Sequence, residues 1–389
     1  MKEGWKYKRL GEICDFQGGS QPPKSEWTDS LLDGYVRMLQ IRDFTQSRKV
    51  SPEYVKSSKK LRFCKSDDIL LGRYGASVGK VLTGLEGAYN VAIMKTIPNE
   101  SVISKRYIKR YFESDLFQDI LKRVCGIRAA QAGFSKEDIE NELVPVPSLA
   151  EQQQIVSFLD SEFEKIDALK ANAETQLQAA KDLFQKALKE MLTPKDGWEE
   201  KKLGEICDFR SGFAFKSSLF TESGEPIIRI SDIQNGEIED SKVVYFNLNS
   251  YKENLTKFKV YPNDILIAMS GATTGKVGIN KTDKVFYLNQ RVGVFRENTK
   301  ILEHKYLYYF LNNKAAESLK LAIGAAQPNL STEQINNFIV PIPSLTKQQA
   351  IADNLDTLSA KVKQLQENYN ETITLCNDLK QSLLKRIFE

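Results

Sequence analysis

The chain of 389 residues contains the same segment twice, and this repeat limits the possible folds more than any other feature. Residues 10–16 read LGEICDF, and residues 203–209 read LGEICDF again, 193 positions later. Further matches follow at an offset of 196, among them GASVGKV at 75–81 and GATTGKV at 271–277. A repeat of this length is a duplicated domain, because solenoid units have periods of about 20 to 50 residues. The sequence therefore predicts two similar domains in tandem.

Each copy of the repeat ends in a proline-containing segment, VPVPSL at 144–149 and VPIPSL at 340–345. Proline disfavours helix in the residue before it and donates no backbone hydrogen bond, so both segments indicate extended connectors. A long polar stretch follows each one, with apolar residues at steps of three and four. We therefore expect two amphipathic helices of about 40 residues, each roughly 60 Å long at 1.5 Å per residue.

The two predicted helices match in length, which favours pairing with each other in opposite directions. Separate helices would each need about 60 Å of apolar groove on their own domain, so an antiparallel coiled coil is the better interpretation. The predicted domains are 1–147 and 194–343, and the predicted helices are 148–193 and 344–389. The residues expected in the coiled-coil core are Ile155, Leu159, Phe163, Ile166, Leu177, Phe184, Ile351, Leu355, Leu358, Val362, Leu365, Leu379 and Leu383.

Each globular half has the pattern of a mixed α/β domain. Residues 68–71 and 264–268 are short apolar strands, each followed by a predicted partner strand across a glycine-rich turn. The apolar spacing at 107–124 and 306–321 predicts helix. The expected fold class is α/β (α+β) domains in tandem duplicate, with two long α-helices that form an antiparallel coiled coil.

Composition points to a globular protein without a membrane segment. Hydrophobic residues make up 41% of the chain and charged residues 27%, and no run reaches the roughly 18 to 20 apolar residues that span a bilayer. The start of the chain lacks an apolar signal core, and the five cysteines form no CxxC pair. We expect a reduced, cytoplasmic protein.

The net charge of +4 is distributed unevenly along the chain. Residues 1–149 hold 25 basic and 19 acidic groups, whereas residues 197–345 hold 18 and 17. The surplus positive charge therefore lies on the globular halves, mostly on the first one. This distribution suits a polyanionic partner such as nucleic acid, but the surplus is too small to prove one.

The most tempting catalytic motif is GASVGK at 75–80, which resembles a phosphate-binding loop. That loop requires four residues between its glycines and a Ser or Thr after the lysine to hold magnesium. Here three residues separate the glycines and Val81 follows the lysine, and the second copy fails in the same way at Val277. We interpret both segments as tight turns between strands, whose Ser, Thr and Lys side chains can still contact DNA phosphates.

Other catalytic signals are weaker still. His304 is the only histidine, has no counterpart in the first copy, and is expected to be solvated at the start of a surface helix. Cys14 and Cys207 are equivalent in the repeat and are expected to pack in the core as small hydrophobic residues. The sequence shows no metal-ligand spacing, no dinucleotide-binding glycine motif and no amino-methyltransferase motif. We expect no catalytic residue, no metal site and no cofactor on this chain itself.

Side chains that make paired hydrogen bonds to base edges gather at matching points of the two copies. Where the first copy has QIR at 40–42, the second has RIS at 229–231, and such divergence inside a common frame suits two domains that read different bases. The candidate DNA-binding residues are Gln40, Arg42, Arg73, Tyr74, Ser77, Lys80, Asn90, Arg128 and Gln131 in the first copy, and Arg229, Ser231, Ser270, Thr273, Thr274, Lys276, Asn289, Gln290, Arg291 and Gln327 in the second.

These features together resemble the specificity subunits of type I restriction-modification enzymes, the HsdS family. The resemblance rests on the LGEICDF openings, the DIL…GKV strands and the helix starts with QQQI at 152–155 and QQAI at 348–351. No single motif is very specific. Their order, the duplication and the alternation of domain and helix cover nearly the whole chain.

The resemblance implies two target-recognition domains, each of which reads one half of a bipartite site in double-stranded DNA. It implies that the paired helices set the unspecified gap between the half-sites. It also implies partners: two methyltransferase (modification) subunits that methylate adenine at N6, and motor-nuclease (restriction) subunits with ATP-dependent endonuclease activity. S-adenosylmethionine, ATP and magnesium are then expected on those subunits and not on this chain.

Two other interpretations stay open at this point. An autonomous enzyme with an unfamiliar site would show activity or cofactor binding in the purified chain. A coiled-coil scaffold without sequence-specific DNA reading would have no reason to diversify the repeats at polar positions while it keeps their frame.

Overall fold

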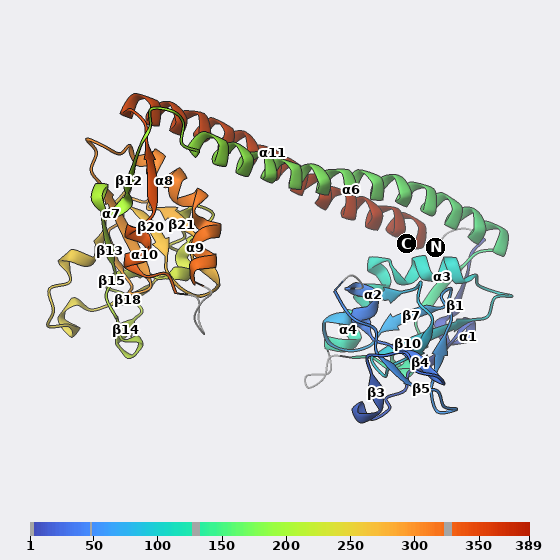
Figure 1. Cartoon of the computed structure of the whole chain (residues 1–389). Coiled ribbons are helices and arrows are strands. Elements are labelled where there is room, and N and C mark those ends of the chain that lie inside the picture. Colours follow the sequence, from blue (N-terminus) through green and yellow to red (C-terminus); the bar gives the residue numbers. More distant parts are fainter. Residues whose placement is uncertain (1–3, 47–48, 127–132, 323–328) are drawn as a thin grey trace. The chain divides into compact units, whose positions relative to one another are not determined.

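A computed structural model describes residues 4–46, 49–126, 133–322 and 329–389. The chain divides into two compact units, and each is described by itself. The first unit contains Met1–Glu174 with Asn370–Glu389, and the second contains Thr175–Tyr369. Each unit holds one globular domain together with part of each long helix, α6 (Leu149–Leu192) and α11 (Leu345–Phe388) (Figure 1).

The first domain is built from short strands and short helices. Its strands are β1 (Lys6–Arg9), β2 (Cys14–Gly18), β3 (Trp27–Thr28), β4 (Tyr35–Leu39), β5 (Tyr54–Lys56), β6 (Phe63–Cys64), β7 (Ile69–Gly72), β8 (Val81–Leu82), β9 (Gly87–Tyr89), β10 (Ile93–Pro98) and β11 (Leu143–Val146). Its helices are α1 (Leu10–Ile13), α2 (Ile41–Thr45), α3 (Lys105–Phe112), α4 (Asp115–Gly126) and α5 (Lys136–Ile139), with 3-10 turns η1 (Lys24–Glu26) and η2 (Gly75–Ser77).

The second domain repeats this series with an added β-hairpin and additional 3-10 turns. Its strands are β12 (Glu199–Lys202), β13 (Cys207–Ser211), β14 (Phe220–Thr221), β15 (Glu225–Ile228), β16 (Ile233–Gln234), β17 (Glu237–Ile238), β18 (Val244–Phe246), β19 (Lys259–Val260), β20 (Ile265–Ala268), β21 (Val277–Ile279), β22 (Phe286–Leu288), β23 (Val292–Glu297) and β24 (Ile339–Ile342). Its helices are α7 (Leu203–Ile206), α8 (His304–Asn313), α9 (Ala315–Ala322) and α10 (Thr332–Asn336), with 3-10 turns η3 (Ser217–Leu219), η4 (Ile230–Asp232), η5 (Leu248–Ser250), η6 (Thr256–Phe258) and η7 (Gly271–Thr273).

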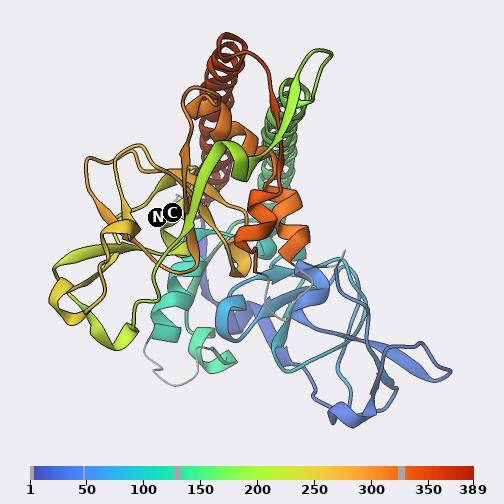
Figure 2. The same ribbon diagram turned by 60° about the vertical axis from the view of Figure 1, so that its left-hand side comes forward.

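Sheet topology confirms the duplication. The strand order β2-β10-β7-β8 in the first domain is matched by β13-β23-β20-β21 in the second, where the hairpin β16–β17 extends the sheet. The order β3-β5-β4-β9-β6 is matched by β14-β18-β15-β22-β19. In the first domain this five-stranded sheet lies on the side remote from the long helices (Figures 1 and 2). The fold is therefore a tandem pair of α/β domains with two long helices, as the sequence predicts.

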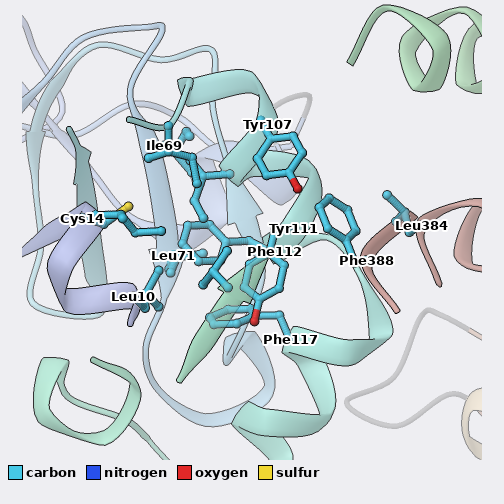
Figure 3. Packing of buried hydrophobic residues seen from close by; sticks show 14 of the residues in the cluster. Leu10, Cys14, Ile69, Leu71, Tyr107, Tyr111, Phe112, Phe117, Leu384 and Phe388 are labelled. Carbon is cyan, nitrogen blue, oxygen red and sulfur yellow. The ribbon is translucent and has the colours of Figure 1, made fainter. Parts of the chain in front are cut away.

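Alternating side chains of the central strands supply two separate layers of core. In β7, Ile69 and Leu71 point into the cluster beneath α3 and α4, whereas Leu70 points into the cluster shared with the five-stranded sheet. This is the two-residue period of a strand that is covered on both faces. Figure 3 shows the first cluster, where rings from α3 and α4 meet Leu384 and Phe388 of α11.

A buried glutamine fixes each long helix to its domain. The amide of Gln152 donates to the carbonyl oxygens of Val102 and Pro147 at 2.9 and 3.0 Å, and its oxygen accepts from the backbone of Ser104. Gln348 repeats these contacts with Ile301, Pro343 and Glu303 in the second unit. Both glutamines are fully buried. A buried amide needs such partners, which explains why the QQ motif recurs at both helix starts.

The long helices pair in opposite directions within the first unit. Lys380 forms an ion pair with Asp167 at 2.6 Å, and Lys170 donates to Asn377 at 2.9 Å. Both contacts obey one antiparallel register, because the number rises on α6 as it falls on α11. Buried Leu159, Phe163 and Ile166 of α6 share a cluster with Cys376, Leu384 and Phe388 of α11. Ile155 and Leu383 pack partly buried against it.

In the second unit, Leu188 and Leu192 of α6 share a cluster with Ile351 and Leu355 of α11. Phe184 packs partly buried against it. Val362 is also buried, while Leu177 and Leu358 are half-buried.

The prediction of the coiled-coil core is wrong for two residues. Leu365 and Leu379 are exposed by 39% and 50%. Val362 and Cys376 are buried, and the next position on the same face of the helix is Gln366 or Lys380. Polar residues therefore occupy the seam at these two places, and Leu365 and Leu379 each lie one position away from it.

Candidate nucleic-acid interface

In the first domain, two candidate residues follow the ends of neighbouring parallel strands. β4 pairs with β9 in parallel, with Leu39 opposite Tyr89. Gln40 and Asn90 come directly after these positions, and the backbone nitrogen of Asn90 donates to the carbonyl of Leu39 at 3.1 Å. Because parallel strands end at the same edge of a sheet, the two side chains start from one place.

The second domain has the same arrangement with different side chains. β15 pairs with β22 in parallel, with Ile228 opposite Leu288. Arg229 and Asn289 follow, and the backbone nitrogen of Asn289 donates to the carbonyl of Ile228 at 3.1 Å. Arg229 thus stands where the first domain has Gln40.

The glycine-rich turns reach the same edge. The backbone nitrogen of Arg73 donates to the carbonyl of Ala92 at 2.8 Å, next to the turn that begins at Asn90. In the second domain Met269 donates to Arg291 at 2.8 Å. We call these surfaces the strand-end edges: residues 40–42, 73–77 and 90 in the first domain, and residues 229–231, 270–274 and 289–291 in the second.

A glycine lets the chain pass close under each strand-end edge. A Cβ atom on Gly19 would lie 2.1 Å from the carbonyl oxygen of Asn90, and one on Gly212 would lie 2.1 Å from that of Leu288. Both distances are far below van der Waals contact, so any larger residue displaces the strand end. The sequence interpretation missed this pair, although both glycines stand at the start of the divergent segments.

A buried aspartate organises the first segment of each edge. Asp43 accepts from the backbone of Gln40 and from the guanidinium of Arg37, both at 2.8 Å. Asp232 accepts from the backbone of Arg229 and from the hydroxyl of Ser231, both at 2.8 Å. The two aspartates are 2% and 3% exposed. They are positioning residues, since a buried carboxylate with charged and backbone partners holds its neighbours in one conformation.

Two candidates of the first edge have partners already. Glu53 accepts from the amide of Gln40 at 2.7 Å and forms ion pairs with Arg42 and with Lys24. Burial alone would raise the pKa of Glu53, but hydrogen bonds from Lys24 and Gln40 and the nearby charge of Arg42 lower it overall. These contacts of Gln40 and Arg42 with Glu53 must therefore break before either side chain can use the same groups to bind DNA.

Most candidate hydroxyls serve their own turns. Ser77 donates to the carbonyl of Tyr74 at 2.7 Å, and Thr274 donates to that of Gly271 at 2.7 Å. Thr273 donates to the carbonyl of Ser270 at 3.4 Å. Ser270 is 7% exposed, and its hydroxyl has no partner among the described residues. These groups shape η2 and η7 more than they present donors to a ligand.

Other candidates present side chains at the surface of the second edge. Gln290 and Arg291 are exposed, and neither side chain has an ion pair or hydrogen bond within the described residues. The Asn289 side chain accepts from the backbone of Arg291 at 3.3 Å, so it holds the turn that presents them. Arg229 is half-buried and donates to the carbonyl of Lys242 at 2.9 Å.

In the first edge, Tyr74 is 41% exposed and Arg73 lies against its ring at 5.2 Å. Arg73 also donates to the carbonyl of Phe134 at 3.2 Å. Asn90 accepts from the backbone of Ala92 at 3.2 Å, as Asn289 does in its own turn.

The two candidate lysines are exposed and occupy equivalent positions of the repeat. Lys80 lines a cavity of about 440 Å³ in the first unit, together with Arg110, Phe163 and Lys380 near the long helices. Lys276 is the counterpart of Lys80 in the second unit and is also exposed. Arg128, Gln131 and Gln327 lie outside the described residues.

One cationic residue at the first edge was missed. The backbone carbonyl of Arg62 accepts from Tyr89, and its backbone nitrogen donates to the hydroxyl of Ser20 at 3.2 Å. Arg62 is exposed. It lies 28 residues from Asn90 in sequence, so only the pairing of β6 with β9 brings it to the edge.

The groups that could support catalysis are committed to structure. Burial raises the pKa of the Cys14 and Cys207 thiols to about 12, which keeps them protonated. His304 is not solvated as expected: it is half-buried, and its Nδ1 lies 2.9 Å from a carboxylate oxygen of Glu297. Across the described ranges, no cluster of His, Cys, Asp and Glu could hold a metal ion.

No helix in that part of the chain combines the length and apolar content needed to cross a membrane.

The comparison with protein families decides the classification. A family model described as type I restriction modification DNA specificity domain matches residues 2–179 and again residues 195–375. The chain belongs to this family. The two matches correspond to the two copies of the repeat, so each copy is one specificity domain followed by most of one long helix.

Curated relatives of this family are similar over most of the chain. The MjaVIII specificity subunit of Methanocaldococcus jannaschii is 27% identical over 92% of this chain and 87% of its own length. The EcoBI specificity subunit of Escherichia coli is 24% identical over 100% of this chain and 86% of its own length. Both proteins are named as specificity subunits of type I restriction enzymes.

Solved structures of the family share the fold. A chain from a study of complex assembly and conformational transition of the type I R-M system has a TM-score of 0.79 at 20% identity, covering 99% of this chain and 98% of that chain. The HsdS subunit from Thermoanaerobacter tengcongensis has a TM-score of 0.53 at 20% identity, covering 100% and 97%. At this identity the likeness concerns the fold alone.

Proposed function

We propose that the chain is the DNA specificity subunit of a type I restriction-modification complex and is not catalytic by itself. Residues 1–147 and 194–343 form two target-recognition domains, each of which reads one half of a bipartite site in double-stranded DNA. Residues 148–193 and 344–389 form the spacer that sets the gap. The predicted cytoplasmic location stays a prediction.

The observation that carries this proposal is the conserved frame with changed side chains at the strand-end edges. The backbone contacts after Leu39 and Tyr89 recur after Ile228 and Leu288 at the same distance. The side chains on that frame differ, because Gln40 stands where the second domain has Arg229. After the shared asparagine, Asn90 or Asn289, the first domain continues with Val91 and Ala92, where the second has the exposed Gln290 and Arg291. Glutamine suits adenine and arginine suits guanine, so the two edges suit different bases.

This difference argues against the scaffold interpretation. A scaffold would need the folded frame, but it would not need different side chains at equivalent positions of the strand-end edges. The candidate DNA-binding residues therefore remain our proposal for the reading surface, with Gln290 and Arg291 as the most available readers.

Exposed apolar residues also repeat on the long helices, outside their seam, and on the strand that precedes each helix. Large apolar side chains are exposed at equivalent positions 196 residues apart: Leu143 and Ile339, Leu149 and Leu345, Leu169 and Leu365, Leu183 and Leu379. We infer that these positions contact a partner, since apolar side chains are exposed at the same positions of both copies. Because the same pattern occurs twice, it fits two copies of one partner.

We identify that partner as the methyltransferase subunit, which would methylate adenine beside each recognised half-site. Motor-nuclease subunits complete the restriction activity in this proposal. S-adenosylmethionine, ATP and magnesium belong to those subunits, because the strand-end edges of this chain offer hydrogen-bonding side chains for DNA rather than an enclosed cofactor site.

The experiment is to purify the chain with its neighbouring methyltransferase subunits, methylate random-sequence DNA and map the modified adenines by long-read sequencing. The expected result is one split motif with a fixed gap. Scattered or absent methylation by an intact complex would favour the scaffold interpretation instead.

A further inference from the structure

The first domain carries a strongly basic loop beside its strand-end edge. Residues 56–62 contain Lys56, Lys59, Lys60 and Arg62, and no acidic residue occurs between Glu53 and Asp67. This segment begins at the last residue of β5 and leads to β6 in the five-stranded sheet.

All four cations are exposed. Within the described residues, none of them takes part in an ion pair or a side-chain hydrogen bond. The neighbouring cations behave differently, because Lys24 and Arg42 both pair with Glu53. Four unpaired like charges in seven residues repel one another, and nearby anionic charge removes that repulsion.

The loop is nevertheless held in one conformation. Leu61 is 7% exposed and packs with Val55 and Ala88 beneath the loop. The backbone of Ser57 donates to Gly34 at 2.9 Å at one end. At the other end Arg62 contacts Ser20 and Tyr89. The cations therefore follow an ordered path that ends next to Asn90.

The corresponding loop of the second domain lacks this charge. Residues 247–258 connect β18 to β19. Leu255 is 3% exposed and anchors this loop, as Leu61 anchors the loop of the first domain. This loop has two lysines, Lys252 and Lys257, and one acid, Glu253. These loops therefore account for part of the difference in net charge between the two halves of the chain.

We propose that residues 56–62 bind the sugar-phosphate backbone of DNA beside the half-site read by the first domain, without reading bases. The inference rests on the proposed function, since it takes DNA as the ligand. Lysine is a point charge suited to phosphate, and each neutralised phosphate releases counterions whatever the base sequence. The first domain thus holds DNA by charge in addition to its base contacts, and the second domain depends on its base contacts.

The test compares two matched double variants of the full chain in complex with its methyltransferase subunits. One is Lys59→Gln with Lys60→Gln, and the other is Lys252→Gln with Lys257→Gln in the equivalent loop. Affinity for a duplex of unrelated sequence is measured by fluorescence anisotropy between about 50 and 200 mM salt. Melting temperatures verify that both variants are folded, and the methylated motif is mapped for each.

The first variant is expected to reduce the magnitude of the negative slope of log affinity against log salt by up to about 1.8, at about 0.9 for each lost phosphate contact. The second is expected to leave the slope unchanged, and both should methylate the wild-type motif. Equal slopes in the first variant and the wild type, or an equal fall in both variants, would overturn the inference. A changed base preference in the first half-site would also overturn it, because the loop would then read bases.

Failure of the proposed function looks different in the same experiment. A wild-type complex that methylates no split motif refutes the function, whatever the salt slopes are. A wild-type motif with an unchanged salt slope refutes only the role of residues 56–62.

Discussion

The ring of Phe388 lies edge-on to the ring of Tyr111, with centroids 5.5 Å apart and planes at 76°. Phe388 also meets Tyr107 edge-on at 5.4 Å, and its side chain is 3% exposed. The last turn of α11 is therefore part of the core of the first domain, at the opposite end of the sequence (Figure 3).

Replacing Phe388 with alanine is expected to destabilise the first unit by roughly 3 kcal/mol. This is the low end for removing a buried phenylalanine, because a chain end can partly close the cavity. Chemical denaturation of the full chain measures the loss. Leu375→Ala on the same helix is the control, since Leu375 is 57% exposed. An equal loss in both variants would contradict a specific role of the aromatic contact, because substitution by alanine does not lower helix propensity.

The stability of the second domain is expected to fall as pH rises from weakly acidic to weakly basic. The hydrogen bond with Glu297 raises the pKa of His304 above its ordinary value, although burial opposes this. A raised pKa means that the stabilisation is complete below the ordinary histidine value near 6.5 and is lost as pH rises through the higher folded value. Thermal melting between about pH 5.5 and 8.5 measures it.

The matched variant is His304→Gln, which removes the titrating group from the chain's only histidine position. Its melting temperature should change little across this pH window. At acid pH, the wild type should lose stability as Glu297 is protonated: burial raises the pKa of Glu297, but the bond from His304 lowers it overall. A wild type as flat as the variant would contradict the prediction.

Arg291→Ala is expected to relax the base preference of one half-site and leave the other unchanged. Arg291 is exposed at the strand-end edge of the second domain, without a partner among the described side chains. A paired contact to guanine contributes about 1 to 3 kcal/mol of discrimination, or roughly 5- to 150-fold. Motif mapping by methylation measures the change. Loss of specificity at both half-sites would indicate a general defect instead.

Asp43→Asn and Asp232→Asn form a reciprocal pair of tests for positioning. Asp43 holds Gln40 and Arg37, and Asp232 holds Arg229 and Ser231. The amide side chain keeps the shape of the carboxylate but loses its charge and one acceptor. Each variant should therefore relax the base preference of one half-site only. Methylation rates on sites altered in either half provide the measurement. If both variants blur the same half, the assignment of domains to half-sites is wrong.

Removing one heptad from each long helix, residues 171–177 and 370–376, should shorten the gap by about three base pairs. These segments are matched by the register of Asp167 with Lys380 and Lys170 with Asn377. Seven residues correspond to about 10.5 Å of helix, or three steps of 3.4 Å in DNA. The recognised bases should not change. Altered bases with an unchanged gap would contradict the spacer role.

Much of the fold could be predicted because it depends on local patterns. The duplication, the strands around the glycine-rich turns and the two long helices all follow from residue spacing and from repeated motifs. The strand-end edges were also partly predictable, since Gln40 and Arg229 stand at equivalent places in the repeat. What the pattern could not show was which side chains are free, because Glu53 reaches Gln40 and Arg42 only in the folded sheet.

The sequence by itself determined that the chain has two copies of one α/β domain, each followed by a long amphipathic helix. Tertiary structure decided the helix seam, where Gln366 and Lys380 displace Leu365 and Leu379, and it decided that Arg62 lies beside Asn90. The physical reason is range. Periodicity and turn chemistry act over a few residues, whereas helix phase and the partners of a polar side chain depend on residues that meet only when distant segments pack.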